Sequence, residues 1–304
     1  MTISAGFRRF APLALAGTLV LGACGAGNAL GKDEVFAVNG SGYSTKDFNS
    51  IIDTLVETKQ LSKTNGKVAG TDLSSILRVI IKWESYKQFK DQLGLTDDAA
   101  TVKSVQDSAD KDKTFAGYPK AMQDLLIGLS VAEGTLNAGK IPTTSRIKSL
   151  YEKLPASSGV LCLSHILVKS QAQARQVLKD IAEGKTFAEE ANAKTIDPSG
   201  KSNGGVLPDG DKRCQTVVNA QNVFDPDFVR GALAAKAGVP YGPVKTKFGW
   251  HVILNESYDK VSADIETALA NKPLQQMLMG FMATADIRVD SAYGSWDPAT
   301  SSVG

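Results

Sequence analysis

The sequence has little histidine, few aromatic residues and no excess of charge of either sign. Two of its 304 residues are histidine, and 7% are aromatic. Its 34 basic residues nearly match its 32 acidic ones, and setting aside Arg8 and Arg9, which lie in a candidate leader, leaves 32 of each. A neutral chain without a basic stripe excludes a nucleic-acid-binding protein. With 42% hydrophobic residues and no internal repeat, the sequence predicts a globular protein of about two domains.

Long apolar runs are also absent, apart from one near the start of the chain. Phe10–Ala23 is apolar over 14 residues, whereas a helix needs about 20 to cross a bilayer. The run follows Arg8 and Arg9, and it ends in Leu-Gly-Ala-Cys at residues 21–24. A positive start, a short apolar stretch and small residues before a cysteine indicate an export signal that is later removed. The last four residues resemble the lipobox of bacterial lipoproteins.

This leader predicts the location of the protein. We expect residues 1–23 to be a lipoprotein signal peptide and Cys24 to become the lipid-modified first residue of the mature chain. Residues 24–32 then form a flexible tether, because they are rich in glycine. The protein is expected on the outer face of a bacterial cell membrane, held there only by the lipid. The alternative is a secreted protein in which this cysteine is incidental.

Cysteine is scarce, which makes the two remaining residues of this type informative. With Cys24 assigned to the lipid, Cys162 and Cys214 are left in an oxidising compartment, where disulfides persist. A bridge between them would close a loop of about 50 residues and stabilise the fold by about 4 kcal/mol. The alternative is that both thiols are free and buried.

The first half of the mature chain has the pattern of a helical region. Phe48, Ile51, Ile52 and Leu55 follow the i, i+3, i+4, i+7 spacing of one buried helical face. Further helical patterns continue to about residue 155, and the region 33–155 contains neither histidine nor cysteine. We therefore expect no catalytic cluster in it.

The pattern changes after Pro155. Val160–Val168 is β-prone and apolar on both faces, which predicts a central strand. Helical and strand-like segments then alternate up to about residue 256. The helical pattern returns at 262–284, and its apolar face needs a partner that the earlier helices can supply. The fold class we expect is α+β, with an α/β domain at 159–256 inserted into a helical module formed by 33–155 and completed by 257–304.

Both histidines lie within apolar strand-like segments of the inserted domain. Burying an unpaired imidazole costs a few kcal/mol, and His165 and His251 could satisfy each other through one shared hydrogen bond if their strands are neighbours. The alternative is that the two histidines are a hydrogen-bonded pair in the core with no catalytic role. Cys162 and Cys214 would complete a two-Cys, two-His zinc set. Because residues three apart on a strand point to opposite faces, we expect no metal, and no other cofactor.

Several motifs in order give the segment from about Gly159 to Glu256 a specific resemblance. They are Ser164–Val168, Gly184 with Phe187-Ala188, Asp197 followed by Gly204-Gly205, Phe224–Phe228, and Gly242–Ile253. The segment resembles a parvulin-type peptidyl-prolyl isomerase. Rotation about a peptide bond has a barrier of about 18–20 kcal/mol. Such an enzyme lowers that barrier and breaks no bond. It therefore needs no nucleophile and no metal.

The resemblance implies roles for particular residues. His165 and His251 would form the central catalytic pair with Asp197 beside them, and Thr246 would help to orient a ring. The proline pocket would be lined by Leu207, Phe224 and Phe228, with Phe248 at its edge. The sequence departs from the family at Val206 and Pro208, where the family usually has aspartate and glycine, and the segment before Phe224 is longer than expected.

The flanking segments resemble the PrsA and SurA class of extracytoplasmic chaperones. That resemblance implies a foldase that isomerises X-Pro bonds in unfolded or partly folded exported proteins while its helical module holds them. One alternative is a holdase whose isomerase domain is vestigial, which the departures at Val206 and Pro208 favour. Another is a lipoprotein that binds one specific protein partner.

Overall fold

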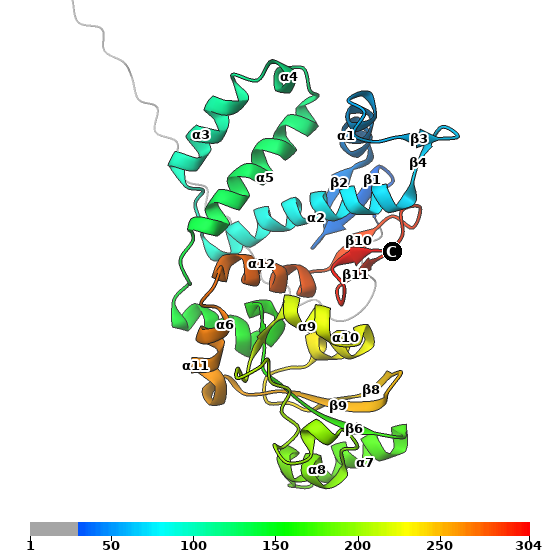
Figure 1. Cartoon of the computed structure of the whole chain (residues 1–304), viewed down its shortest axis with the longest axis vertical. Helices are drawn as coiled ribbons and strands as arrows, with labels where there is room; N and C mark the ends of the chain where they lie inside the picture. Colours follow the sequence, from blue (N-terminus) through cyan, green and yellow to red (C-terminus); the bar gives the residue numbers. More distant parts are fainter. Residues whose placement is uncertain (1–29) are drawn as a thin grey trace, which may run out of the picture.

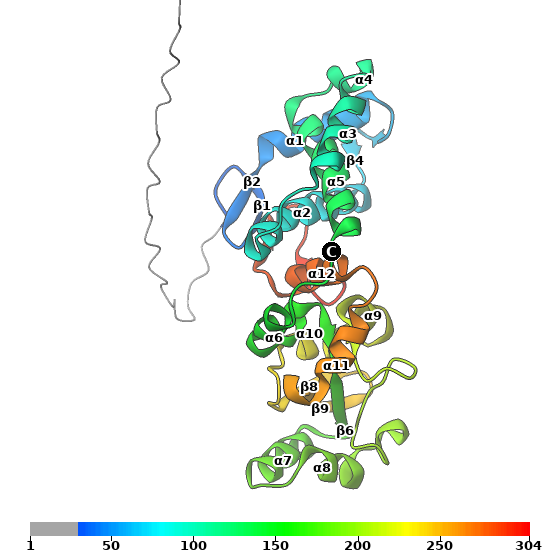
Figure 2. The same cartoon turned by 90° about the vertical axis from the view of Figure 1, so that its left-hand side faces the viewer.

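The computed structural model describes residues 30–304 and has mixed helices and strands arranged along one long axis (Figures 1 and 2). The expected signal peptide and Cys24 lie outside the described residues. We call residues 33–155 with 257–304 the helical part and residues 159–256 the inserted part. Among the described residues, no helix has both the length and the apolar character needed to cross a membrane.

The helical part is built mainly from helices of both ends of the chain. They are α1 (Thr45–Glu57), α2 (Gly70–Leu93), α3 (Ala99–Ala109), α4 (Lys113–Ala116), α5 (Lys120–Ala138), α6 (Thr144–Lys153), α11 (Tyr258–Ala268) and α12 (Pro273–Thr284). Ser44 caps the start of helix α1, and its side-chain oxygen accepts a hydrogen bond from the Asp47 backbone N–H. Its residues Phe48, Ile51 and Ile52 are buried, as their spacing predicts.

One hydrophobic core joins the two ends of the chain. Helix α12 packs against α2 and α5, and its Leu278 belongs to the same buried cluster as Ile80 of α2. Strand β1 (Glu34–Val38) lies between β2 (Ser41–Ser44) and β10 (Ile287–Val289) in an antiparallel sheet. A small hairpin of β3 (Lys63–Thr64) and β4 (Lys67–Val68) precedes α2.

The backbones of the two parts touch directly at a pair of glycines. A Cβ atom on Gly280 of α12 would lie 2.3 Å from the Ala156 carbonyl oxygen. Gly159 has a φ of +85°, and a Cβ there would lie 2.4 Å from the Gln276 carbonyl oxygen. Ala156 belongs to the short helix η1 (Pro155–Ser158), which leads into the inserted part. Only glycine allows the two backbones to approach so closely.

The inserted part has an antiparallel sheet in the order β6-β9-β8, covered by helices. The strands are β6 (Leu163–Val168), β8 (Tyr241–Thr246) and β9 (Gly249–Asn255). Helices α7 (Gln171–Ala182) and α8 (Phe187–Lys194) follow β6, and η2 (Pro198–Gly200), α9 (Val217–Val223) and α10 (Pro226–Ala234) come later. A second, two-stranded sheet pairs β5 (Val160–Leu161) with β7 (Gln215–Thr216).

The expectation of one central strand over Val160–Val168 is wrong. The run breaks at Cys162, and β9 rather than β6 is the middle strand of the sheet. The segment is apolar on both faces because Ile166 packs towards α7 and α8 while Leu163 packs towards α10. Its burial therefore comes from covering helices and not from strands on both sides.

The last described residues form a small hairpin between the two parts. Strands β11 (Trp296–Asp297) and β12 (Ser302–Val303) pair with each other, and we call Trp296–Val303 the C-terminal hairpin. Ala299 is fully buried in the cluster that contains Phe228 of α10. Val303 is buried in the cluster of the helical part. The hairpin thus contributes one residue to each core.

Candidate active site

The two histidines meet at the middle of the sheet of the inserted part. His165 of β6 and His251 of β9 are both buried, and their Nδ1 atoms lie 3.1 Å apart. The other ring nitrogen of each is also occupied. His165 Nε2 lies 2.8 Å from Asp197 Oδ2, and His251 Nε2 lies 2.8 Å from Thr246 Oγ1. The structure thus brings together all four polar residues that the resemblance singles out.

These contacts form a hydrogen-bonded chain that runs in one direction when both rings are neutral. The Asp197 carboxylate can only accept, so His165 donates from Nε2 and accepts at Nδ1. His251 then donates from Nδ1 and accepts at Nε2 from the Thr246 hydroxyl. The Thr246 oxygen in turn accepts from the Phe248 backbone N–H at 3.1 Å. Each ring nitrogen therefore has a partner inside the protein.

Burial keeps both rings uncharged. It lowers the pKa of His251 to about 4, with His165 adding to the effect. Burial also lowers the pKa of His165, although the neighbouring Asp197 carboxylate opposes this. Burial alone would raise the pKa of Asp197, but hydrogen bonds from Ser199 and His165 hold it below its usual value. At neutral pH the site therefore contains two neutral rings and one carboxylate.

A cavity of about 400 Å³ lies beside this hydrogen-bonded chain of side chains. Its lining includes Leu207, Phe224, Phe228 and Phe248, as well as both histidines and Asp197. Phe228 is buried, and its ring meets the rings of His165 and His251 edge-on, with centroids 5.7 and 5.1 Å away. We call this the site cavity. Its size and apolar walls suit a proline ring.

Some residues of the site cavity were not predicted from the sequence. They are Leu167, Ile196, Pro198, Val223 and Asp225. A period-2 reading places Leu167 on the same face of β6 as His165, so that signal was available. Val223 ends helix α9, which lies in the longer segment that the family motifs do not cover, and it therefore gave no signal.

The departures at Val206 and Pro208 leave the backbone of the site in place. Gly205 has a φ of +82°, and its carbonyl oxygen accepts the His165 N–H at 2.7 Å. The Leu207 N–H donates to the Leu163 carbonyl oxygen at 2.9 Å. These two bonds cover the open edge of β6 and hold Leu207 at the cavity.

A disulfide and an ion pair attach the longer segment, which lies between Leu207 and Phe224, to the rest of the inserted part. Cys162 and Cys214 are both buried and are joined by a disulfide in the structure. Beside them, Arg213 forms an ion pair with the buried Glu256 at 3.0 Å. These contacts hold the segment that follows Leu207 against the start of the inserted part.

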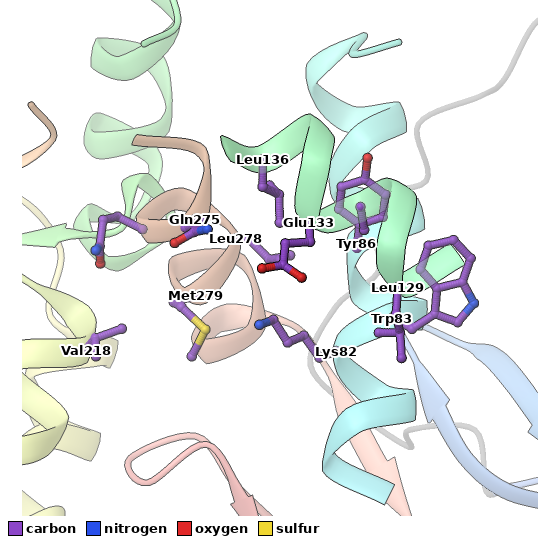
Figure 3. Close-up of a pocket in the computed structure, with 12 residues that line it drawn as sticks. Lys82, Trp83, Tyr86, Leu129, Glu133, Leu136, Val218, Gln275, Leu278 and Met279 are labelled. Atoms are coloured by element: carbon purple, nitrogen blue, oxygen red, sulfur yellow. The ribbon is translucent and has the colours of Figure 1, made fainter. Parts of the chain in front are cut away.

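A second cavity, of about 490 Å³, lies between α2, α5 and α12 of the helical part (Figure 3). Its walls include Trp83, Leu129, Leu136, Leu278 and Met279, and Val218 of α9 adds a contact from the inserted part. The side chains of Lys82 and Glu133 reach into the space between the helices (Figure 3). We call this the helical cavity.

Comparison with known proteins assigns the inserted part. Residues 165–257 match the rotamase family model, described as a PPIC-type PPIase domain. A protein of Clostridium kluyveri named foldase protein PrsA is 31% identical over 152 residues, which cover 46% of this chain and 42% of that protein. One of the same name from Caldanaerobacter subterraneus is 30% identical over 179 residues, covering 56% and 55%. The chain thus matches about half the length of these relatives, or less.

The solved structures give a weaker likeness. The crystal structure of PrsA from Bacillus subtilis is 22% identical, covers 72% of this chain and 86% of that chain, and has a TM-score of 0.29. The assignment of the inserted part rests on the family model, which spans both buried histidines. The chain contains a PPIC-type PPIase domain.

Proposed function

We propose that this protein is a foldase, a peptidyl-prolyl isomerase combined with a chaperone for unfolded polypeptides. The observation that carries the proposal is the chain Thr246–His251–His165–Asp197 beneath an apolar cavity, within a segment that matches the PPIase model. Phe224 and Phe228 offer the proline ring an apolar surface, and the buried rings keep that surface in place.

The geometry supports catalysis by shape and environment. Burial of the apolar proline ring in the site cavity favours substrate binding. A site that fits the twisted amide better than either planar form lowers the barrier to rotation. Because every ring nitrogen of the two histidines already has a hydrogen-bond partner within the protein, neither ring needs to exchange a proton with the substrate. We infer that His165 and His251 fix the floor of the site cavity as a neutral, rigid pair, with Asp197 as the fixed charge at one end.

We assign the helical cavity to holding unfolded segments. Its apolar walls suit hydrophobic side chains, while Lys82 and Glu133 offer a donor and an acceptor for backbone groups. A half-open cavity of this kind holds many sequences weakly, as a chaperone requires.

We further propose that the clients are exported proteins and that the protein acts outside the cytoplasm as a lipoprotein. The Leu-Gly-Ala-Cys sequence that ends at Cys24 supports the lipid anchor. A Cys162–Cys214 disulfide fits an oxidising compartment. Release of the protein from membranes in a Cys24→Ala variant tests the anchor, and mass spectrometry of the mature N-terminus identifies the lipid.

The isomerase proposal is tested by changing one wall of the site cavity. We expect Phe224→Ala to lower kcat/KM for X-Pro peptides about tenfold or more, because about 1.5–3 kcal/mol of apolar contact with the ring is lost. The measurement is a protease-coupled isomerisation assay on a chain that begins at Gly25, with a panel of X-Pro peptides.

Phe115→Ala is the matched control, since Phe115 is also a half-buried phenylalanine but lies on α4, away from the site cavity. Its kcat/KM is expected to equal that of the wild type. A folded wild type that isomerises none of the peptides would contradict the isomerase half of the proposal and leave a holdase.

A further inference from the structure

The C-terminal hairpin packs on the helices that carry one wall of the site cavity. Ala299 has no exposed surface and shares a buried cluster with Val217 and Ala220 of α9 and with Phe228 of α10. Phe228 is itself a lining residue of the site cavity. The hairpin therefore contacts the back of the wall whose front faces the substrate.

Polar contacts fix the hairpin to the same two helices. Gln221 of α9 donates from Nε2 to the Pro298 carbonyl oxygen at 2.7 Å and to Ser301 Oγ at 2.8 Å. Arg230 of α10 donates from Nη2 to Asp297 Oδ2 at 3.0 Å and from Nε to Asp297 Oδ1 at 3.3 Å. Each of the two helices is thus held by two directional bonds to a segment 67 to 80 residues further along the chain.

The other side of the hairpin belongs to the helical part. Val303 lies in the buried cluster of α2 and α12, Trp296 packs against that cluster, and β12 packs on α2. The hairpin also lies outside residues 165–257, which match the PPIase model. It is therefore an addition to that domain, supplied by the helical part.

Helices α9 and α10 supply much of the site cavity. Val223 is the last residue of α9 and Phe224 follows it, while Asp225 caps the start of α10 and Phe228 lies in its first turn. A shift of either helix would move these side chains relative to the histidine pair, which is held by the sheet. Placement errors of about 1 Å in a site of this kind are costly.

We propose that the C-terminal hairpin positions the proline pocket, with Asp297 and Ala299 as positioning residues that hold α9 and α10 against the sheet. Through it, the helical part controls how well the isomerase site is formed. This inference rests on the proposed isomerase function.

The test is a mutant cycle on the Arg230–Asp297 pair in the full chain. Asp297→Asn keeps an acceptor for the Ala299 N–H, which lies 3.0 Å from Oδ1, but removes the charge. We expect Asp297→Asn and Arg230→Gln each to lower kcat/KM about threefold, mainly by raising KM, since the pair is partly exposed. Arg230→Gln also removes the ion pair between Arg230 and Asp227, so the double variant should lose no more than Arg230→Gln does alone.

Hydrogen exchange separates positioning from a general loss of stability. Amides of α9 and α10 should exchange faster in these variants, while those of β9 keep their wild-type rates. Asp259→Asn is the matched control, because it removes the Lys148–Asp259 pair on α6 and α11, away from α9 and α10. Neither its kcat/KM nor its exchange should change.

Ala299→Asp is the stronger second variant, because it places a carboxylate where no surface is exposed and should displace the hairpin. A tenfold fall in kcat/KM with faster exchange in α9 and α10 supports the proposal. Displacement of the hairpin with unchanged kcat/KM overturns it, as do additive losses in the cycle. An inactive wild type refutes the isomerase function instead, and calorimetric Kd values of an X-Pro peptide for the same variants then decide the inference.

Discussion

His251 shows what a single buried residue contributes at this site. Its pKa is lowered to about 4, whereas an unfolded chain titrates its histidines near 6.5. Between these values the unfolded state binds more protons than the folded state, so stability rises with pH through this window. The contribution of His251 to the free energy of unfolding is fully present above pH 6.5. As the pH falls towards 4, the free energy of unfolding decreases on this account by at most about 3 kcal/mol.

The pH dependence can be measured directly because the sequence contains two histidines. We expect the His251 ring signals in NMR spectra of a tag-free protein to titrate well below pH 6, and the free energy of unfolding in urea to fall between pH 6.5 and 4.5. His251→Gln, which cannot titrate, should flatten much of that fall. A midpoint near 6.5 would contradict the buried, neutral ring.

At the scale of elements, the edge of β6 depends on a backbone shape that glycine provides. Gly205 accepts the His165 N–H with a φ of +82°, and a Cβ atom there would lie 2.4 Å from the His165 carbonyl oxygen. We expect Gly205→Ala to lower the free energy of unfolding by about 3 kcal/mol, through left-handed backbone strain and a clash with the strand. Isomerisation should fall with it, because β6 carries His165.

Gly210 provides the comparison that separates strain from clash. It also has a positive φ, of +57°, but nothing lies within 4 Å of the position a Cβ would take. Gly210→Ala should therefore cost only the backbone strain, about 1 kcal/mol. Equal losses in urea denaturation of the two variants would show that the contact with His165 has no role.

Elements also show where sequence reasoning succeeded. The meeting of His165 and His251 follows from two apolar strands, because each buried imidazole needs a partner and a neighbouring strand can supply one. Helix α1 followed from its spacing. Both features are encoded by residues close together in the sequence or by motifs of the domain.

Other elements depended on partners that the sequence does not reveal. Helix α9 is short, and its buried Val217 and Ala220 face a hairpin that comes about 80 residues later. Nothing in the sequence around Ala299 indicates that it is buried, because its burial comes from packing with residues of α9 and α10. The position of β6 at the sheet edge was missed because covering helices bury a strand as fully as neighbouring strands do.

At the scale of the whole molecule, the helical cavity is where the proposed chaperone action can be tested separately from the proposed isomerisation. We expect the double variant Leu129→Gln with Met279→Gln to suppress aggregation of an unfolded client about fivefold less well, because both side chains line that cavity. Its kcat/KM for short X-Pro peptides should stay at the wild-type value, since neither residue lines the site cavity. Light scattering of a diluted, denatured client measures the first quantity.

The control for this variant changes two apolar residues that line neither cavity. Val79 and Val102 are 44% and 41% exposed on α2 and α3. Val79→Gln with Val102→Gln should suppress aggregation as the wild type does. If both double variants lose the same amount, any apolar surface would serve, and the helical cavity would have no special part.

The contact of Gly280 with Ala156, and of Gly159 with Gln276, has a consequence for the client handling proposed above. The two backbones are in direct contact at these positions, which restricts movement of the inserted part against the helical part. A client segment held in the helical cavity would therefore present its neighbouring residues to the site cavity at a fixed separation. Its prolines would experience a local concentration set by the length of client chain between the two cavities. Under the proposed function, prolines a suitable number of residues from an apolar stretch would then be isomerised first.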